Sequence, residues 1–180
     1  ASALVQALQS ITSRNVDPIE SAVVSVTQIH AGDTWNVIPD AAVLRGTTRA
    51  FRPEVQDLIE RRVREVCSGV AATYGTQVKV RYERRYPPTV NAAHETEICA
   101  SVLEGMVGAE NVIRVPPVMG SEDFAFMLQA KAGCYVFVGN GPGAGGCMLH
   151  NPHYDFNDEV LPLGASYWAN LAEHMLAVRA

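Results

Sequence analysis

Hydrophobic residues recur at two different periods in the first half of the chain, and each period predicts a different kind of element. Apolar positions three and four residues apart predict amphipathic helices over residues 2–13 and 53–70, and a proline opens the second at an early helical position. β-Branched residues favour strands over 21–29 and 41–51. Strict alternation of apolar and polar residues over 76–85 predicts a third strand with one buried face.

The order helix, strand, strand, helix, strand indicates a ferredoxin-like α+β sandwich, because two strand-helix-strand units build that fold. The chain supplies every element of the sandwich except the first strand. Pro87 and Pro88 then interrupt the pattern. We therefore expect one domain over residues 1–86 and the next over 87–180.

The second half predicts helices over about 93–105, 121–130 and 161–178, with short strands at 112–115 and 134–138. The strand at 134–138 is apolar on both faces, as an interior strand of a helix-covered, mostly parallel sheet would be. Such a sheet needs neighbours on each side, so this half is expected to be the C-terminal part of a larger α/β domain. The expected fold class is α/β, with the partial ferredoxin-like domain preceding this segment.

Composition narrows the classes of partner. A net charge of −5 argues against a nucleic-acid surface, which needs clustered Lys and Arg. The four cysteines show no C-x-x-C spacing, which favours a reducing compartment. No apolar run approaches the roughly 18 residues that span a bilayer, and the N-terminus lacks a signal-peptide pattern. We expect a cytoplasmic protein with neither a membrane nor a nucleic acid as partner.

His150 is the first candidate for chemistry. It follows the glycine-rich loop 139–146 and precedes Pro152, which restricts Asn151 to an extended conformation and stiffens the segment. A neutral imidazole in such a turn suits a divalent metal, but a catalytic zinc site needs about three protein ligands. From spacing alone, a turn histidine hydrogen-bonded to backbone is an equally good interpretation.

The segment 119–124 (Met-Gly-Ser-Glu-Asp-Phe) is the second candidate. Ser121 is placed as the N-cap of a helix, and Glu122 and Asp123 in its first turn. Carboxylates there are favoured by the helix dipole, which explains at least one of them without any function. The alternative is that Glu122 faces a substrate, which makes it a candidate catalytic residue.

The third candidate joins the polar loop 30–40 to the strand that follows it. Asn36 and Arg49 could converge across loop and strand, where Arg49 would clamp a carboxylate and Asn36 would donate to an oxyanion. His30 lies in the same loop. The alternatives are turn formation for Asn36 and an exposed strand position for Arg49.

Four motifs together resemble peptidase family M20, in the branch of hippurate hydrolases, N-acyl-amino-acid amidohydrolases and auxin-conjugate hydrolases. They are Ile-His-Ala-Gly at 29–32 with Asn-Val-Ile-Pro-Asp at 36–40, Gly-Thr-Thr-Arg at 46–49, Met-Gly-Ser-Glu-Asp-Phe at 119–124, and His-Asn-Pro at 150–152 with Tyr-Asp-Phe-Asn-Asp at 154–158. In this order and spacing they are specific, and they span nearly the whole chain.

The resemblance implies a lid domain that also mediates homodimerisation over residues 1–86, and the end of a catalytic α/β domain over 87–180. By that likeness His150 is the last ligand of a site for two divalent ions, with zinc, manganese, nickel or cobalt as candidates. Asn36 and Arg49 match positions that bind the substrate carboxylate and polarise the scissile carbonyl, and His30 is assigned to substrate binding beside them.

The same likeness implies an enzyme that cleaves the amide bond of N-acyl amino acids with metal-activated water. The family's other metal ligands and its general-base glutamate have no counterpart in this sequence, so we expect the 180-residue chain alone to be inactive. The alternative function is a non-catalytic lid or dimerisation module that self-associates through an exposed edge strand and helix.

Overall fold

The computed structural model describes residues 1–143 and 146–176. They form two compact units. The first unit holds Ala1–Pro88 together with Val118–Glu122, and the second holds Thr89–Pro117 together with the described residues from Asp123 onward. No helix in these ranges has the length and the apolar character that crossing a membrane requires.

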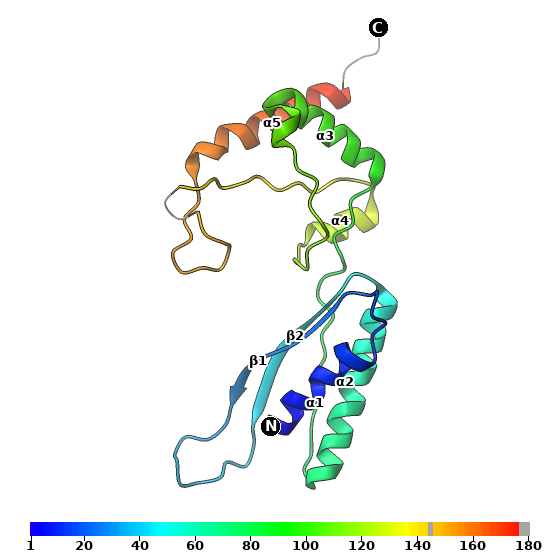
Figure 1. Cartoon of the computed structure of the whole chain (residues 1–180), viewed down its shortest axis with the longest axis vertical. Coiled ribbons are helices and arrows are strands. Elements are labelled where there is room, and N and C mark those ends of the chain that lie inside the picture. Colours follow the sequence, from blue (N-terminus) through cyan, green and yellow to red (C-terminus); the bar gives the residue numbers. More distant parts are fainter. Residues whose placement is uncertain (144–145, 177–180) are drawn as a thin grey trace. The chain divides into compact units, whose positions relative to one another are not determined.

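The first unit is a β-hairpin covered on one face by two helices (Figure 1). Its elements are α1 (Ser2–Arg14), β1 (Ala22–His30), β2 (Val43–Ala50) and α2 (Pro53–Tyr74). These confirm the two helices and the first two strands predicted from periodicity. Helix α2 begins with its proline at the first turn, where a missing N–H costs nothing, and ends at Gly75 in the left-handed conformation that glycine adopts freely.

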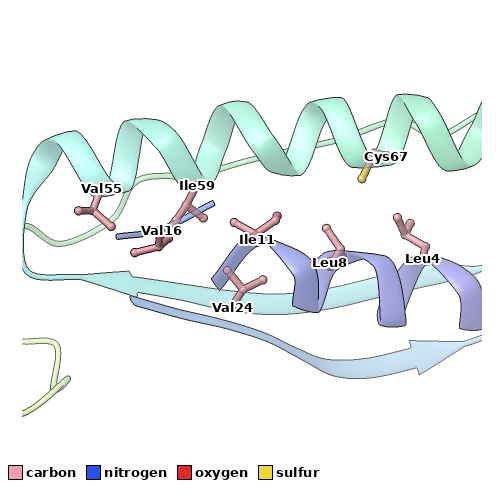
Figure 2. Packing of buried hydrophobic residues seen from close by; sticks show 8 residues of the cluster. All are labelled: Leu4, Leu8, Ile11, Val16, Val24, Val55, Ile59 and Cys67. Carbon is pink, nitrogen blue, oxygen red and sulfur yellow. The ribbon is translucent and has the colours of Figure 1, made fainter. Parts of the chain in front are cut away.

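The core of this unit lies between the two helices and the hairpin, as Figure 2 shows. Leu8 and Ile11 of α1 and Ile59 of α2 point toward one another over Val24 of β1. The helical stripe predicted for residues 55–70 is confirmed, because every apolar member of it is buried in this cluster or packs against it. The buried members are Leu4, Leu8, Ile11, Val16, Val24, Val55, Ile59 and Cys67.

Strands β1 and β2 are antiparallel, with Ala22 opposite Ala50 at one end and His30 opposite Val43 at the other. A bulge between Val26 and Gln28 shifts the register once. Such bulges bend a strand and increase its twist. The hairpin therefore has two distinct ends, and the loop 31–42 forms its tip.

The strand predicted over 76–85 is wrong as an element, because this segment joins no ladder among the described residues. The segment still belongs to the first unit, and part of its predicted inner face is covered, although Val78 on that face is 39% exposed. Val80 packs on the core, and the hydroxyls of Tyr82 and Thr48 share a hydrogen bond of 2.6 Å. Arg84 pairs with Asp57 of α2 at 2.6 Å. The predicted inner face is confirmed at Val80 and Tyr82 and not at Val78, and a strand also needs a backbone partner.

The second unit contains α3 (Ala93–Val107), α4 (Phe124–Ala130) and α5 (Leu161–Leu176), with short 3₁₀ turns at η1 (Ala109–Asn111) and η2 (Asp158–Val160). Helices α3 and α5 pack together, and both were predicted. The predicted end of the last helix, Val178, lies outside the described residues. Cys99 of α3 and Tyr167 of α5 are both buried, and burial raises the pKa of the Tyr167 hydroxyl.

The strands predicted at 112–115 and 134–138 are also wrong for the described part of the chain, where neither segment pairs with another strand. The segment around Tyr135 is instead anchored by Asn91, whose side chain donates to the Tyr135 carbonyl at 2.9 Å and accepts from its N–H at 2.8 Å. The observed architecture is thus mixed α/β with a two-stranded antiparallel sheet. The further details of the expected lid fold stay predictions.

Candidate functional site

Arg49 lies on β2, opposite Val23, near the end of the hairpin away from its tip. The residue is half-buried, and its guanidinium donates twice from Nη1, to the Met119 carbonyl at 2.5 Å and to Ser121 Oγ at 2.8 Å. Both acceptors belong to the segment 118–122, which packs with the first unit. The exposed-strand alternative for Arg49 therefore does not describe its environment.

The arginine has no acidic partner among the described residues, since no carboxylate lies within ion-pairing distance of it. Most other described arginines are paired, as Arg84 is with Asp57 and Glu60. Binding an anion would stabilise a partly buried cation that has no counterion. The planar guanidinium matches the geometry of a carboxylate in particular.

His30 and Asn36 lie at the opposite end of the hairpin. His30 closes the ladder opposite Val43, and it lines an open depression of about 490 Å³ together with Ile29, Gly32 and Asp33. Asn36 lies in the exposed tip, where Thr34 Oγ1 donates to its Oδ1 at 2.9 Å. That bond is typical of a local turn. Turn formation, the alternative role for Asn36, therefore explains the hydrogen bond that its Oδ1 accepts.

The convergence of Asn36 with Arg49 does not occur within one chain. The register places seven residue steps of β1 between His30 and the partner of Arg49, Val23. At about 3.3 Å per residue, the two ends of the hairpin are roughly 23 Å apart. The loop 31–42 lies beyond the His30–Val43 pair at one end of the ladder, and Arg49 lies near the other end. One small substrate bound at Arg49 cannot also touch Asn36 of the same chain.

Ser121 does not cap a helix, which corrects a prediction. Helix α4 begins at Phe124, and Asp123 precedes it without a side-chain capping bond. Glu122 and Asp123 therefore stand before the helix and not in its first turn. The Ser121 hydroxyl instead accepts a bond from Nη1 of the charged Arg49 at 2.8 Å. Glu122 is half-buried.

His150 occupies a turn in the second unit, where Asn151 N–H donates to the Met148 carbonyl at 3.1 Å. Its φ of 69° makes it the one non-glycine residue with positive φ in the described part of the chain. This is the third position of the turn, where glycine is preferred when φ is positive. The imidazole is exposed and not packed, as the sequence predicted. A non-glycine residue held in this conformation is a reason to expect function there.

Two asparagines hold the ends of the loop that carries His150, and the sequence analysis assigned a role to neither, although Asn157 lies in the motif at 154–158. Asn140 donates from Nδ2 to the Asp155 carbonyl at 2.8 Å, and its Oδ1 accepts from Asn157 N–H at 2.8 Å. Asn157 returns a bond to the Asn140 carbonyl at 3.2 Å. The loop is therefore closed at its base. The expected glycine-rich loop includes residues 144–145, which lie outside the described residues.

The described residues hold only part of a donor set for a metal ion. Within residues 1–143 and 146–176, no three His, Cys, Asp or Glu side chains lie close enough together to hold an ion. The turn of His150 presents one imidazole, whereas a catalytic zinc site needs about three protein ligands. The described residues thus fit a single ligand of a metal centre and not the centre itself.

Comparison with known proteins agrees with this partial character. The model of peptidase family M20/M25/M40 matches residues 3–174. The hippurate hydrolase of Campylobacter jejuni is 38% identical over 96% of this chain and 44% of its own length. An IAA-amino acid hydrolase (ILR1-like 4) of Arabidopsis thaliana is 36% identical over 98% of this chain and 41% of its own.

Among solved structures, a dinuclear metal-binding peptidase of family M20 from Bacillus subtilis superposes with a TM-score of 0.71. It is 28% identical, and the match covers 95% of this chain and 43% of that one. The chain belongs to peptidase family M20, as its motifs predicted. It spans less than half the length of these curated relatives.

Proposed function

We propose that this chain is part of a metal-dependent amidohydrolase that cleaves the amide bond of an N-acyl amino acid. The observation that carries the proposal is the half-buried Arg49, anchored by neutral acceptors and without a carboxylate partner among the described residues. A carboxylate ligand would supply its missing counterion. Two relatives are named for hydrolysis of amino-acid conjugates, hippurate and IAA-amino acids, whose products include a free amino acid.

Divalent metal ions are the proposed cofactor, with His150 as a ligand and zinc, manganese, nickel or cobalt as candidates. A metal ion would supply a water of lowered pKa and polarise the scissile carbonyl. The B. subtilis peptidase, described as dinuclear, supports two ions in the intact enzyme. Because the described residues contribute one ligand, the 180-residue chain alone is proposed to be inactive.

A homodimer is the proposed assembly. In the described residues β1 pairs only with β2, so its other edge offers unpaired N–H and C=O groups to a second copy. Trp35 and Ile38 on the hairpin tip are 100% and 93% exposed, which is a cost unless a partner covers them. The separation of Asn36 from Arg49 further supports a role for the tip in the second copy, since it cannot serve substrate at its own base.

The metal assignment is tested with His150→Ala in the full-length enzyme, using His153→Ala as a matched control three residues along the same loop. We expect His150→Ala to lower bound metal by about one equivalent and turnover by at least about a hundredfold, with an unchanged circular dichroism spectrum. His153→Ala should retain both. Unchanged turnover of the His150 variant in saturating metal would show that another group binds the ion.

The alternative function, a non-catalytic dimerisation module, is favoured only by the unpaired edge of β1. Sedimentation and a panel of N-acyl amino acids separate the two functions when applied to the full-length protein and to this chain. The amidohydrolase is supported if the full-length protein binds metal and turns over substrate and this 180-residue chain does neither. A stable dimer without turnover in either protein would support the alternative.

A further inference from the structure

The most specific long-range contact in the first unit joins Arg49 to a segment seventy residues later in the chain. The Met119 carbonyl and Ser121 Oγ accept from the same nitrogen, Nη1. Both acceptors are neutral. Arg84 in the same unit shows the contrast, because its partners are the carboxylates of Asp57 and Glu60.

Neutral acceptors have a consequence for ligand binding. A carboxylate beside Arg49 would satisfy its charge and compete with any anionic ligand, whereas a carbonyl and a hydroxyl fix the guanidinium and leave its positive charge uncompensated. They also restrict a side chain that otherwise samples many rotamers, so less entropy is lost when a ligand binds.

The choice of nitrogen matters as well. Both bonds leave from Nη1, so the edge formed by Nε–H and Nη2–H makes no hydrogen bond within the described part of the chain. The two N–H groups on that edge are parallel, and a carboxylate accepts from such a pair with both of its oxygens. The guanidinium is therefore held at Nη1, and its Nε–Nη2 edge is left to bind a ligand.

We propose that Ser121 is a positioning residue for Arg49, and that the Met119 carbonyl and Ser121 hydroxyl together make this arginine selective for the free carboxylate of the substrate. This rests on the proposed function, in which Arg49 binds that carboxylate. Ser121 acts through Arg49 and does not itself touch the substrate. The competing explanation is structural, since the same two bonds also tie the segment 118–122 to β2.

Steady-state kinetics on the full-length enzyme separate these explanations. The substrates are an N-acyl amino acid and its neutral carboxamide analogue, with release of the acyl acid as the measured product. The variants are Ser121→Ala, Ser121→Thr, Arg49→Ala and the double Arg49→Ala/Ser121→Ala. Arg45→Ala is the matched control, because Arg45 lies on the same strand and its Nη1 donates to the neutral Gln28 side chain at 3.4 Å.

We expect Ser121→Ala to raise KM for the carboxylate substrate about tenfold, equivalent to about 1.4 kcal/mol. Its kcat and its KM for the carboxamide should stay within about twofold of the wild type. Ser121→Thr keeps a hydroxyl at this position, so its KM for the carboxylate substrate should stay close to that of the wild type. In the Arg49→Ala background the serine change should have no further effect, because the residue it positions is gone.

Each other outcome overturns the inference in a recognisable way. If Arg49→Ala raises KM selectively for the carboxylate but Ser121→Ala does not, the clamp stands and the role of Ser121 is refuted. If Ser121→Ala weakens both substrates equally, or lowers the melting temperature together with kcat, its role is structural. If Arg49→Ala shows no selectivity, Arg49 is not the clamp, and that part of the proposed function fails together with the inference.

Discussion

Gly46 lies in β2 opposite Val26, beside the bulge that shifts the register of the hairpin. A Cβ added there would overlap the Ser25 carbonyl oxygen and lie 3.1 Å from Val26 Cα. Both are backbone atoms, so no side-chain rotation can relieve the clash. Gly46→Ala must therefore push the two strands apart at the bulge, three residues from Arg49.

The expected cost follows from the kind of atom that is displaced. Forcing an additional methyl group into a filled site typically costs about 1–3 kcal/mol, and a rigid backbone neighbour favours the upper half of that range. Gly69→Ala is the matched control, because it adds the same methyl group in α2 where no atom beyond the chain neighbours and the adjacent helix backbone lies within 4 Å. Replacing a glycine inside a helix by alanine stabilises it by roughly 0.5–1 kcal/mol.

Hydrogen exchange measures the effect locally, in peptides that cover residues 22–30 and 43–50 of the full-length protein. A loss of about 1.4 kcal/mol in opening free energy speeds exchange about tenfold, so a cost of about 2–3 kcal/mol should accelerate these peptides by roughly thirtyfold to 150-fold in Gly46→Ala. Gly69→Ala should leave them unchanged or slower. Equal exchange in the two variants would mean that β1 does not pass as close to Gly46 of β2 as the structure shows.

Two further predictions concern the first unit. Ile59 has no exposed surface, so Ile59→Ala should lower the free energy of unfolding by about 2–5 kcal/mol and Ile59→Val by about 0.5–1.5 kcal/mol; equal urea midpoints for the two variants would contradict this packing. Hydrogen bonds from Arg64 and then Arg84 lower the pKa of Glu60 below 4.5. Its stabilising contribution is thus fully present above pH 4.5 and lost as the pH falls through the lowered value. Glu60→Gln should flatten the decline of the urea midpoint between pH 5 and pH 3, and an unchanged slope would show that these bonds do not persist in solution.

Hydrophobic periodicity was sufficient to predict the helices and the hairpin, because each of these elements buries one apolar face against a neighbour. The apolar stripes of α1 and α2 predict their partners, because each stripe must face something apolar and the hairpin of β-branched residues follows directly in the chain. Helices α3 and α5 were predicted for the same reason. The sequence also predicted that His150 is exposed, because Pro152, two residues later, restricts the turn that carries it.

The three wrong strands share one cause. Residues 76–85, 112–115 and 134–138 carry strand-like side-chain patterns, but a strand exists only where a neighbouring backbone accepts and donates its hydrogen bonds. Alternation reports which face of a segment is buried, and Val80 and Tyr82 confirm that reading. It does not report whether another strand lies alongside.

The sequence by itself determined the family, the helices, the hairpin and the residue types available for chemistry, because these depend on local spacing and on motifs within a few residues. Only the tertiary structure decided which of those residues meet. It separated Asn36 from Arg49 by the length of the hairpin, and it brought Ser121 to Arg49 across about seventy residues of chain. Contacts of that kind depend on how packed elements place distant backbone segments, and no local pattern encodes that placement.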